Sequence, residues 1–200
     1  DHPSLRVTHI CNRNVERKRK KGDWVSSSVV WTDDCEVVLT SDADVVVELI
    51  GGVTDAKDWI GRSLQAGKDV VTANKQLLAQ HGRELSEIAR ENGRCLFFEA
   101  SVAGGIPIIH GVKQGLAGDT LFRLRGILNG TCNYILTRME AESVSFEEVL
   151  IDAQKLGFAE ADPTEDVDGY DAQAKIAILS SVAFGYELSL KQIPVSGIRT

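Results

Sequence analysis

Apolar residues follow two different spacings in the first half of this chain, and the spacings predict alternating strands and helices. Short β-branched runs are typical of strands, whereas apolar residues three and four positions apart are typical of helices. The predicted strands are residues 5–11, 43–50, 68–72 and 94–99, and the predicted helices are residues 54–66 and 78–91. Short connections in this order predict parallel strands with right-handed crossovers. The unbroken run at 43–50 (ADVVVELI) predicts a strand buried on both faces.

The second half has a mixed pattern. Pro107 predicts the first turn of a helix that reaches about Ala117. Residues 120–128 alternate apolar and polar side chains, as in an antiparallel strand with one solvated face. Two further helices are predicted at 132–140 and 145–156, and the second opens with Ser and Glu at capping-box spacing.

Residues 157–181 are predicted to form an acidic loop followed by an apolar helix. This stretch has six carboxylates and one lysine within residues 160–175. Pro163 and Gly169 predict a loop, and Asp168 is the predicted N-cap of the helix. The helix is predicted to bury a stripe of Ile176, Leu179 and Ala183.

Asp171 and Lys175 then lie four residues apart on one face of this helix. The lysine is suited to donate a proton, and the carboxylates around it are suited to bind a cationic, hydroxyl-bearing substrate. Two alternatives stay open: Asp171 and Lys175 form only a surface ion pair, and the acidic loop is only a solvated connection. A calcium loop is excluded, since Lys175 would occupy the position that needs a bidentate glutamate.

Ligands of parallel sheets bind outside the carboxyl ends of the strands. Gly51, Gly52 and Lys75 follow such ends. The two glycines predict either a turn with positive φ or a close backbone approach to a nicotinamide nucleotide. For Lys75 a functional role is favoured, because an amine is costly to place in a crevice.

The basic segment 12–21 has two interpretations. It is either a solvated, irregular loop, or it follows the second strand of a Rossmann unit. In the second case Arg13 would bind the 2′-phosphate of NADP, with NAD as the alternative cofactor. The Gly-rich fingerprint of such a unit does not occur in the sequence, so we expect the first βα element upstream of residue 1, and a further continuation beyond residue 200.

Composition narrows the class of protein. The chain is 43% hydrophobic and 26% charged, with a net charge of −7, which disfavours a nucleic-acid partner. The sequence has no apolar run of about 18 residues, so no membrane span is predicted. Four scattered cysteines predict reduced thiols and a cytoplasmic location.

Four sequence blocks resemble homoserine dehydrogenases and occur in the family's order. They are VVTANK at 70–75, FEASVAGGIPII at 98–109, LNGTCNYILTRM at 128–139, and AEADP at 159–163 followed by DVDGYDAQAK at 166–175. The resemblance covers roughly residues 37–198. It implies an α/β fold in which a partial Rossmann-like parallel sheet (1–99) is followed by an incomplete α+β substrate/dimerisation domain (100–200).

The resemblance also implies the chemistry. The expected reaction is the NAD(P)-dependent interconversion of L-homoserine and L-aspartate 4-semialdehyde, in threonine, methionine and isoleucine synthesis, by a homodimer. The family's pattern implies catalytic roles for Lys175, Lys75 and Asp171, with Lys75 also near the nicotinamide.

Further roles follow from the same resemblance. Glu160 and Asp166 would bind the substrate ammonium or hydroxyl, and Asn129 and Thr131 would lie near the substrate, beyond their role in a turn and cap. A sodium ion would be bound by main-chain oxygens of Glu99, Val102, Gly104 and Ile106. The competing hypotheses are another Rossmann dehydrogenase of amino acids and a catalytically silent binding or regulatory domain.

Overall fold

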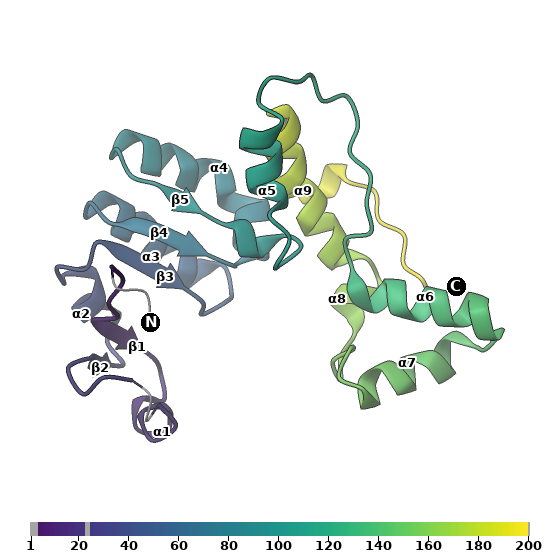
Figure 1. Cartoon of the computed structure of the whole chain (residues 1–200), viewed down its shortest axis with the longest axis horizontal. Helices are drawn as coiled ribbons and strands as arrows, with labels where there is room; N and C mark the ends of the chain where they lie inside the picture. The colour runs from purple at the N-terminus through teal and green to yellow at the C-terminus, as the bar shows by residue number, and fades with distance from the viewer. Residues whose placement is uncertain (1–3, 23–24, 200) are drawn as a thin grey trace. The chain divides into compact units, whose positions relative to one another are not determined.

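The computed structural model describes residues 4–22 and 25–199. By contacts the chain divides into two compact units (Figure 1). The first runs to Thr72 and resumes over Arg83–Phe97, and the second consists of Ala73–Gly82 and the chain from Phe98 onward. Each unit is described by itself.

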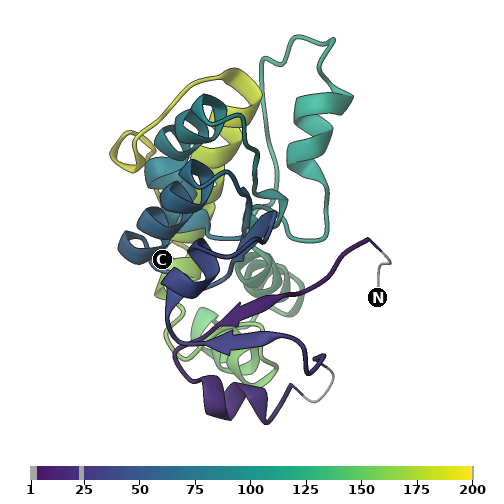
Figure 2. The same ribbon diagram turned by 90° about the vertical axis from the view of Figure 1, so that its left-hand side faces the viewer.

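The first unit is an α/β structure with two parallel sheets. Strands β1 (His9–Cys11) and β2 (Val30–Thr32) pair in parallel and lie side by side in Figures 1 and 2. A second sheet has the order β3 (Val45–Glu48), β4 (Asp69–Thr72), β5 (Leu96–Phe97), also parallel. The predicted parallel arrangement is therefore confirmed.

Helices α3 (Thr54–Gln65) and α4 (Lys75–Glu91) provide most of the core of this unit. Ile60 and Leu64 of α3 and Leu85 of α4 are fully buried, as is Val70 of β4. The prediction that β3 is buried on both faces is wrong. Its Val45 and Val47 are exposed, because no described element covers that face of the strand.

Short elements account for the other differences in this unit. The basic segment is not irregular, because Val15–Arg19 forms helix α1, with Glu16 in its first turn and basic side chains in its last, which suits the helix dipole. Strand β2 and helix α2 (Cys35–Leu39) were not predicted. Elements of three to five residues are too short to show the repeated spacing of apolar side chains from which strands and helices are predicted.

The second unit contains helices and loops in its described residues. Three are of moderate length: α6 (Gly130–Glu142), α7 (Phe146–Lys155) and α9 (Tyr170–Phe184). The shorter ones are η1 (Glu99–Ser101), α5 (Ile108–His110), η2 (Gly111–Gly115), α8 (Thr164–Val167) and η3 (Leu190–Gln192). The predicted capping box of α7 is present, with Ser145 and Glu148 bonded to each other's backbone.

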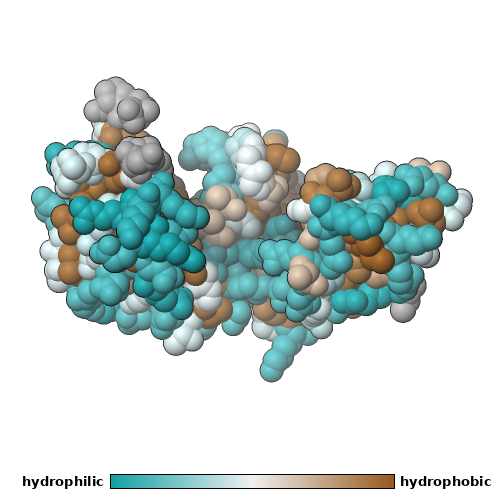
Figure 3. All heavy atoms as spheres, turned by 90° about the horizontal axis from the view of Figure 1, so that it is seen from below, coloured by the Kyte–Doolittle hydropathy of each residue, from teal (hydrophilic) through white to brown (hydrophobic). Residues whose placement is uncertain are grey.

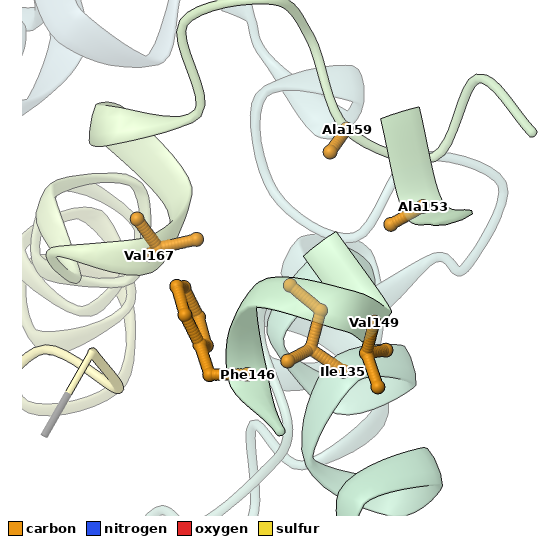
Figure 4. Close-up of a cluster of buried hydrophobic side chains, with 6 residues drawn as sticks. All are labelled: Ile135, Phe146, Val149, Ala153, Ala159 and Val167. Carbon is orange, nitrogen blue, oxygen red and sulfur yellow. The ribbon is translucent and has the colours of Figure 1, made fainter. Parts of the chain in front are cut away.

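A buried apolar cluster joins α6, α7 and α8 (Figure 4). Ile135 of α6 packs with Phe146 and Val149 of α7 and with Val167 of α8. The remaining members are Ala153 and Ala159. This cluster fixes the loop between α7 and α9, which the sequence marks as the acidic loop.

Residues 120–128 do not form the predicted antiparallel strand. They run as a loop into α6 (Figure 1), because they pair with no strand among the described residues. Their apolar side chains are correspondingly exposed, Phe122 by 90% and Ile127 by 75%. Apolar patches also interrupt the mostly hydrophilic surface in the view of Figure 3.

The junction of α8 and α9 differs from its prediction. Asp168 ends α8 and binds Arg199 (Nε–Oδ1 2.5 Å), while Gly169, with φ of 90°, precedes α9. The predicted stripe is also shifted. Ala174, Ala177 and Ile178 lie on the buried side together with Leu179, whereas Ile176 and Ala183 are half-buried.

The chain near residue 197 packs closely on this junction. The amide of Ile198 donates to the carbonyl of Val167 at 2.8 Å. A Cβ at Gly169 would lie 2.8 Å from Val195 Cγ1 and 3.3 Å from the carbonyl oxygen of Ser196. Gly169 is thus required both by its φ and by this contact.

The four cysteines are free thiols, and the Sγ atoms of Cys11 and Cys35 lie 3.1 Å apart. Burial and the bond to Cys11 raise the pKa of Cys35 to about 12. Over the described ranges, no three or more His, Cys, Asp and Glu side chains are grouped to hold a metal ion. Nor does any helix in that part of the chain have the length and apolar character needed to cross a bilayer.

We expect Gly169→Ala to cost roughly 2–3 kcal/mol or more of the free energy of unfolding, because a Cβ adds a clash to the strain of positive φ. Gly157→Ala is the matched control. Gly157 has φ of 77° but no atom within 4 Å of the added Cβ, so it should cost only about 1 kcal/mol. Urea unfolding measures both, and equal losses would contradict the packing argument.

Candidate active site

Two lysines share the carboxylate of Asp171. The Nζ of Lys75 lies 2.7 Å from Oδ1, and the Nζ of Lys175 lies 2.6 Å from Oδ2. All three residues belong to the second unit. The side chain of Asp171 is only 4% exposed, whereas those of Lys75 and Lys175 are 34% and 17% exposed. The pair at i, i+4 is therefore not the surface ion pair that the sequence allowed.

Lys75, Asp171 and Lys175 are positioned by the first turn of helix α4 and the first two turns of helix α9. Lys75 is the first residue of α4, and the side-chain oxygen of Asn74 accepts from the amide of Leu77, as expected of an N-cap. A bond from Gln76 Nε2 to Glu165 Oε2 (2.7 Å) also ties the first turn of α4 to α8. Asp171 is the second residue of α9, and Lys175 follows one turn later.

Asn129 lies beside Asp171 and extends the cluster. Its Nδ2 donates to Asp171 Oδ2 at 2.9 Å and to Asp166 Oδ1 at 2.7 Å. Its Oδ1 accepts from the amide of Cys132 at 2.7 Å, which caps α6. Lys175 Nζ also donates to the carbonyl of Leu128 at 2.8 Å.

The charges in this cluster compensate one another. Burial raises the pKa of Asp171, but the bonds from Lys175, Lys75 and Asn129 outweigh it, so that its pKa lies below the ordinary value. Burial raises the pKa of the Cys132 thiol, and the charges of Asp166 and Asp171 add to that effect. Asp171 is therefore an anion at neutral pH, and Cys132 is a thiol.

The arrangement leaves Lys175 able to act on a ligand. An ammonium has three hydrogens, and the described partners of Lys175 use two of them, at Leu128 and Asp171. The third is available to a ligand oxygen. A group held from two sides with one hydrogen to spare is suited to general acid–base catalysis.

Three of the candidate cofactor residues, Gly51, Gly52 and Arg13, lie in the first unit, and the fourth, Lys75, lies in the second. Gly51 and Gly52 follow β3 with φ of 71° and 73°, and no atom lies within 4 Å of a Cβ built on either. The positive φ predicted for the turn is therefore confirmed, and no neighbouring atom obstructs a close approach to the backbone. Arg13 is exposed just beyond β1.

Glu48 organises the Gly51–Gly52 turn. Its buried carboxylate accepts from the amides of Ile50 (2.8 Å) and Gly51 (3.2 Å) and from the hydroxyl of Thr72 (2.5 Å). The ends of β3 and β4 are thereby tied together. Sequence reasoning missed Glu48, although an acid at the end of an apolar strand and just before two glycines was a usable signal.

Residues 99–106 form a compact turn, with positive φ at Ala103 (51°) and Gly105 (84°). The carboxylate of Glu99 accepts from the amides of Ile109 (2.8 Å) and His110 (2.9 Å). The carbonyl of Ile106 accepts from the amide of Ile108 at 2.8 Å and retains a second lone pair. The carbonyl oxygens of this turn are the kind of ligand that hard cations prefer.

Two family models match adjoining parts of the chain. The one described as "Homoserine dehydrogenase, NAD binding domain" matches residues 1–99, and the one described as "Homoserine dehydrogenase" matches residues 107–200. The chain belongs to the homoserine dehydrogenase family.

Known homoserine dehydrogenases agree in sequence and structure. That of Bacillus subtilis is 47% identical over 192 residues, which are 96% of this chain and 44% of the relative. A solved homoserine dehydrogenase from Thiobacillus denitrificans has a TM-score of 0.89 at 40% identity, over 98% of this chain and 44% of that one. A hyperthermophilic archaeal member solved with NADPH has a TM-score of 0.74 at 29% identity, over 90% of this chain and 58% of that one.

The chain thus spans less than half the length of the first two relatives. The resemblance to homoserine dehydrogenases that the sequence motifs indicated is confirmed, as is the α/β fold class.

The residues singled out from this homoserine dehydrogenase pattern are only partly brought together. Lys75, Lys175, Asp171 and Asp166 lie in one bonded cluster. Glu160 is exposed in the acidic loop, where Gln154 Nε2 holds its carbonyl at 3.0 Å, and it lies outside that cluster. The carbonyl of Leu128 had no sequence signal, since it is a backbone group.

Asp171 should contribute to acid stability in this homoserine dehydrogenase fold. Its folded pKa lies below the ordinary 3.8, so its contribution is present above that value and is lost as the pH falls through the lower folded value. We expect Asp171→Asn to cost about 3 kcal/mol at pH 7, where it leaves two lysines unpaired, and to flatten the loss of stability below about pH 4.

Urea unfolding between pH 7 and pH 3 measures this change. Asp58→Asn, at an exposed position of α3, is the control and should follow the wild-type curve. An Asp171→Asn curve parallel to the wild type at every pH would contradict the assigned ionisation.

Proposed function

We propose that the protein interconverts L-homoserine and L-aspartate 4-semialdehyde with NADP, with NAD as the alternative cofactor. The observation that carries this proposal is the pair of lysines on the two oxygens of one buried aspartate. The family membership supplies the reaction, and the cluster supplies groups of the right chemistry for it. The bound nicotinamide would supply the hydride chemistry.

Lys175 is the proposed proton donor to the carbonyl oxygen of the semialdehyde. In the oxidative direction the same amine would remove the proton from the homoserine hydroxyl. Asp171 would hold Lys175 in place, and Lys75 would add a second positive charge near the oxygen that becomes negative. The bonds of 2.6 and 2.7 Å to Asp171 support this division of roles.

The acidic loop is the proposed binding site for the α-ammonium of homoserine. Asp166, within the cluster, and Glu160, exposed in the loop, are the proposed partners of the ammonium or hydroxyl. A carboxylate forms a charge-assisted hydrogen bond with an ammonium group. The neutral end of the substrate would then face Lys175.

For the cofactor, we propose that Gly51 and Gly52 lie against the nucleotide and that Lys75 contacts the nicotinamide. Arg13 would bind the 2′-phosphate, since a guanidinium matches phosphate with two parallel hydrogen bonds. The open backbone at Gly51 and Gly52 supports the first assignment.

The remaining proposals concern a bound ion, the oligomeric state, the location and the domain boundary. A sodium ion would be bound by the main-chain oxygens of Glu99, Val102, Gly104 and Ile106, for which the compact turn is suited. A homodimer is supported by the exposed apolar side chains of residues 120–128. A cytoplasmic location, a role in threonine and methionine synthesis, and a division at residue 99 into cofactor and substrate domains complete the proposal.

In the full-length protein, we expect Lys175→Ala to lower kcat at least about 100-fold while NADPH affinity changes less than about threefold, because the amine acts on the substrate oxygen. NADPH absorbance with aspartate semialdehyde measures turnover. Lys155→Ala, at an exposed lysine of α7, is the matched control and should retain wild-type kinetics.

Equal losses of turnover and NADPH affinity in Lys175→Ala would contradict the role of Lys175. Wild-type turnover only with other amino-acid substrates would instead support a different dehydrogenase. No turnover with any of them would support a silent binding domain.

We expect Arg13→Ala to weaken NADPH binding about 10–100-fold and to leave NADH binding unchanged, since only NADPH carries the 2′-phosphate. Fluorescence titration of both nucleotides measures the effect. Arg17→Ala, in α1 of the same basic segment, is the control for general loss of positive charge. If both variants lose the same affinity, Arg13 has no specific role.

A further inference from the structure

The side chain of Asn129 makes three contacts that together do more than cap a helix. Its Oδ1 accepts from the Cys132 amide at 2.7 Å, while its Nδ2 donates to Asp166 at 2.7 Å and to Asp171 at 2.9 Å. Both amide hydrogens are thereby used on carboxylates. Asn129 is 8% exposed, so these bonds are made largely out of water.

The cap fixes which way the amide points. A carboxamide rotated by 180° would present its NH₂ to the Cys132 amide, where two donors would face each other, and its oxygen to two carboxylates. Only the observed orientation satisfies the Cys132 amide and both carboxylates. The start of α6 therefore determines that the NH₂ group faces Asp166 and Asp171.

The two carboxylates would repel each other without a shared donor. Asp171 has its Oδ1 on Lys75 and shares its Oδ2 between Lys175 and Asn129. Asp166 lies on the preceding helix α8 and is joined to Asp171 through the Asn129 amide. Asn129 is thus the bridge between the lysine pair and the acidic loop.

We propose that Asn129 is a positioning residue of the dehydrogenase reaction, whose single amide holds Asp171 for the proton-transferring lysines and Asp166 for the substrate ammonium at a fixed separation. The substrate class it serves is an amino acid with a reacting oxygen on its side chain. This inference rests on the proposed function, and it assigns to Asn129 a role other than a turn, a cap or a substrate contact.

Two substitutions separate the cap from the bridge. Asn129→Ser retains an N-cap oxygen but has no NH₂ group to reach the carboxylates. Asn129→Asp retains the cap and replaces the NH₂ group with an oxygen of a third carboxylate. Ser145→Ala, which removes the N-cap of α7, is the control for loss of a cap alone.

Carbon-detected NMR titration of the Asp171 carboxyl group tests the bridge without any turnover. We expect the pKa of Asp171 to rise in Asn129→Ser, since a bond that lowers it is removed, and to rise further in Asn129→Asp. The titratable neighbours of Asp171 in this cluster are Lys75, Lys175, Asp166 and Cys132. Ser145→Ala should leave the Asp171 titration unchanged.

Kinetics test the consequence for the reaction. We expect kcat to fall about 10–100-fold in Asn129→Ser with unchanged NADPH affinity, because displaced groups lose their alignment. In Ser145→Ala we expect lower stability in urea but wild-type kcat.

An unchanged Asp171 titration in Asn129→Ser, or a changed one with wild-type kcat, would overturn the proposal. Absence of turnover in the full-length wild-type protein would instead defeat the proposed function. The NMR titration alone would then decide whether Asn129 bonds to Asp171.

Discussion

The ionised carboxylate of Asp171 is the constraint on which the second unit depends. A buried anion without partners is costly, whereas here two ammonium groups and one amide surround it. Its partners come from the first residue of α4, from the N-cap of α6 and from the second turn of α9. Three helices must therefore begin near one point for this charge to be tolerated.

The local structure supplies these starts in a consistent manner. Asn74 and Asn129 each place a side-chain oxygen on the amide three residues later, and Gly169 supplies the φ from which α9 begins. The positive ends of α6 and α9 also favour carboxylates at this place. Fold and chemistry thus use the same few residues, so that a change in a cap is also a change in the site.

Sequence reasoning succeeded where a signal is local. The β-branched runs of β3 and β4, the capping box of α7 and the four-residue spacing of Asp171 and Lys175 were predicted from neighbours in the chain. Residues 120–128 failed for the opposite reason. Alternation describes a strand only when a partner is present to pair with it.

The site was predictable in its residues but not in its bonds. Nothing near Lys75 in the sequence points to Asp171, and the meeting of the two is a product of tertiary structure. The shifted stripe of α9 has a similar origin, since the packing of the whole unit decides which side is covered. Asp168 was predicted as a cap because the distant Arg199, its actual partner, leaves no trace in the local sequence.

The charges bonded through Asn129 and Asp171 have a consequence for ligand capture. Two lysines and two aspartates cancel, so this group exerts little field beyond about 8 Å, where salt would screen it in any case. A zwitterion that approaches it is neither drawn in nor repelled as a whole. Discrimination must then occur at contact, through the directions of individual donors and acceptors, and should change little with ionic strength.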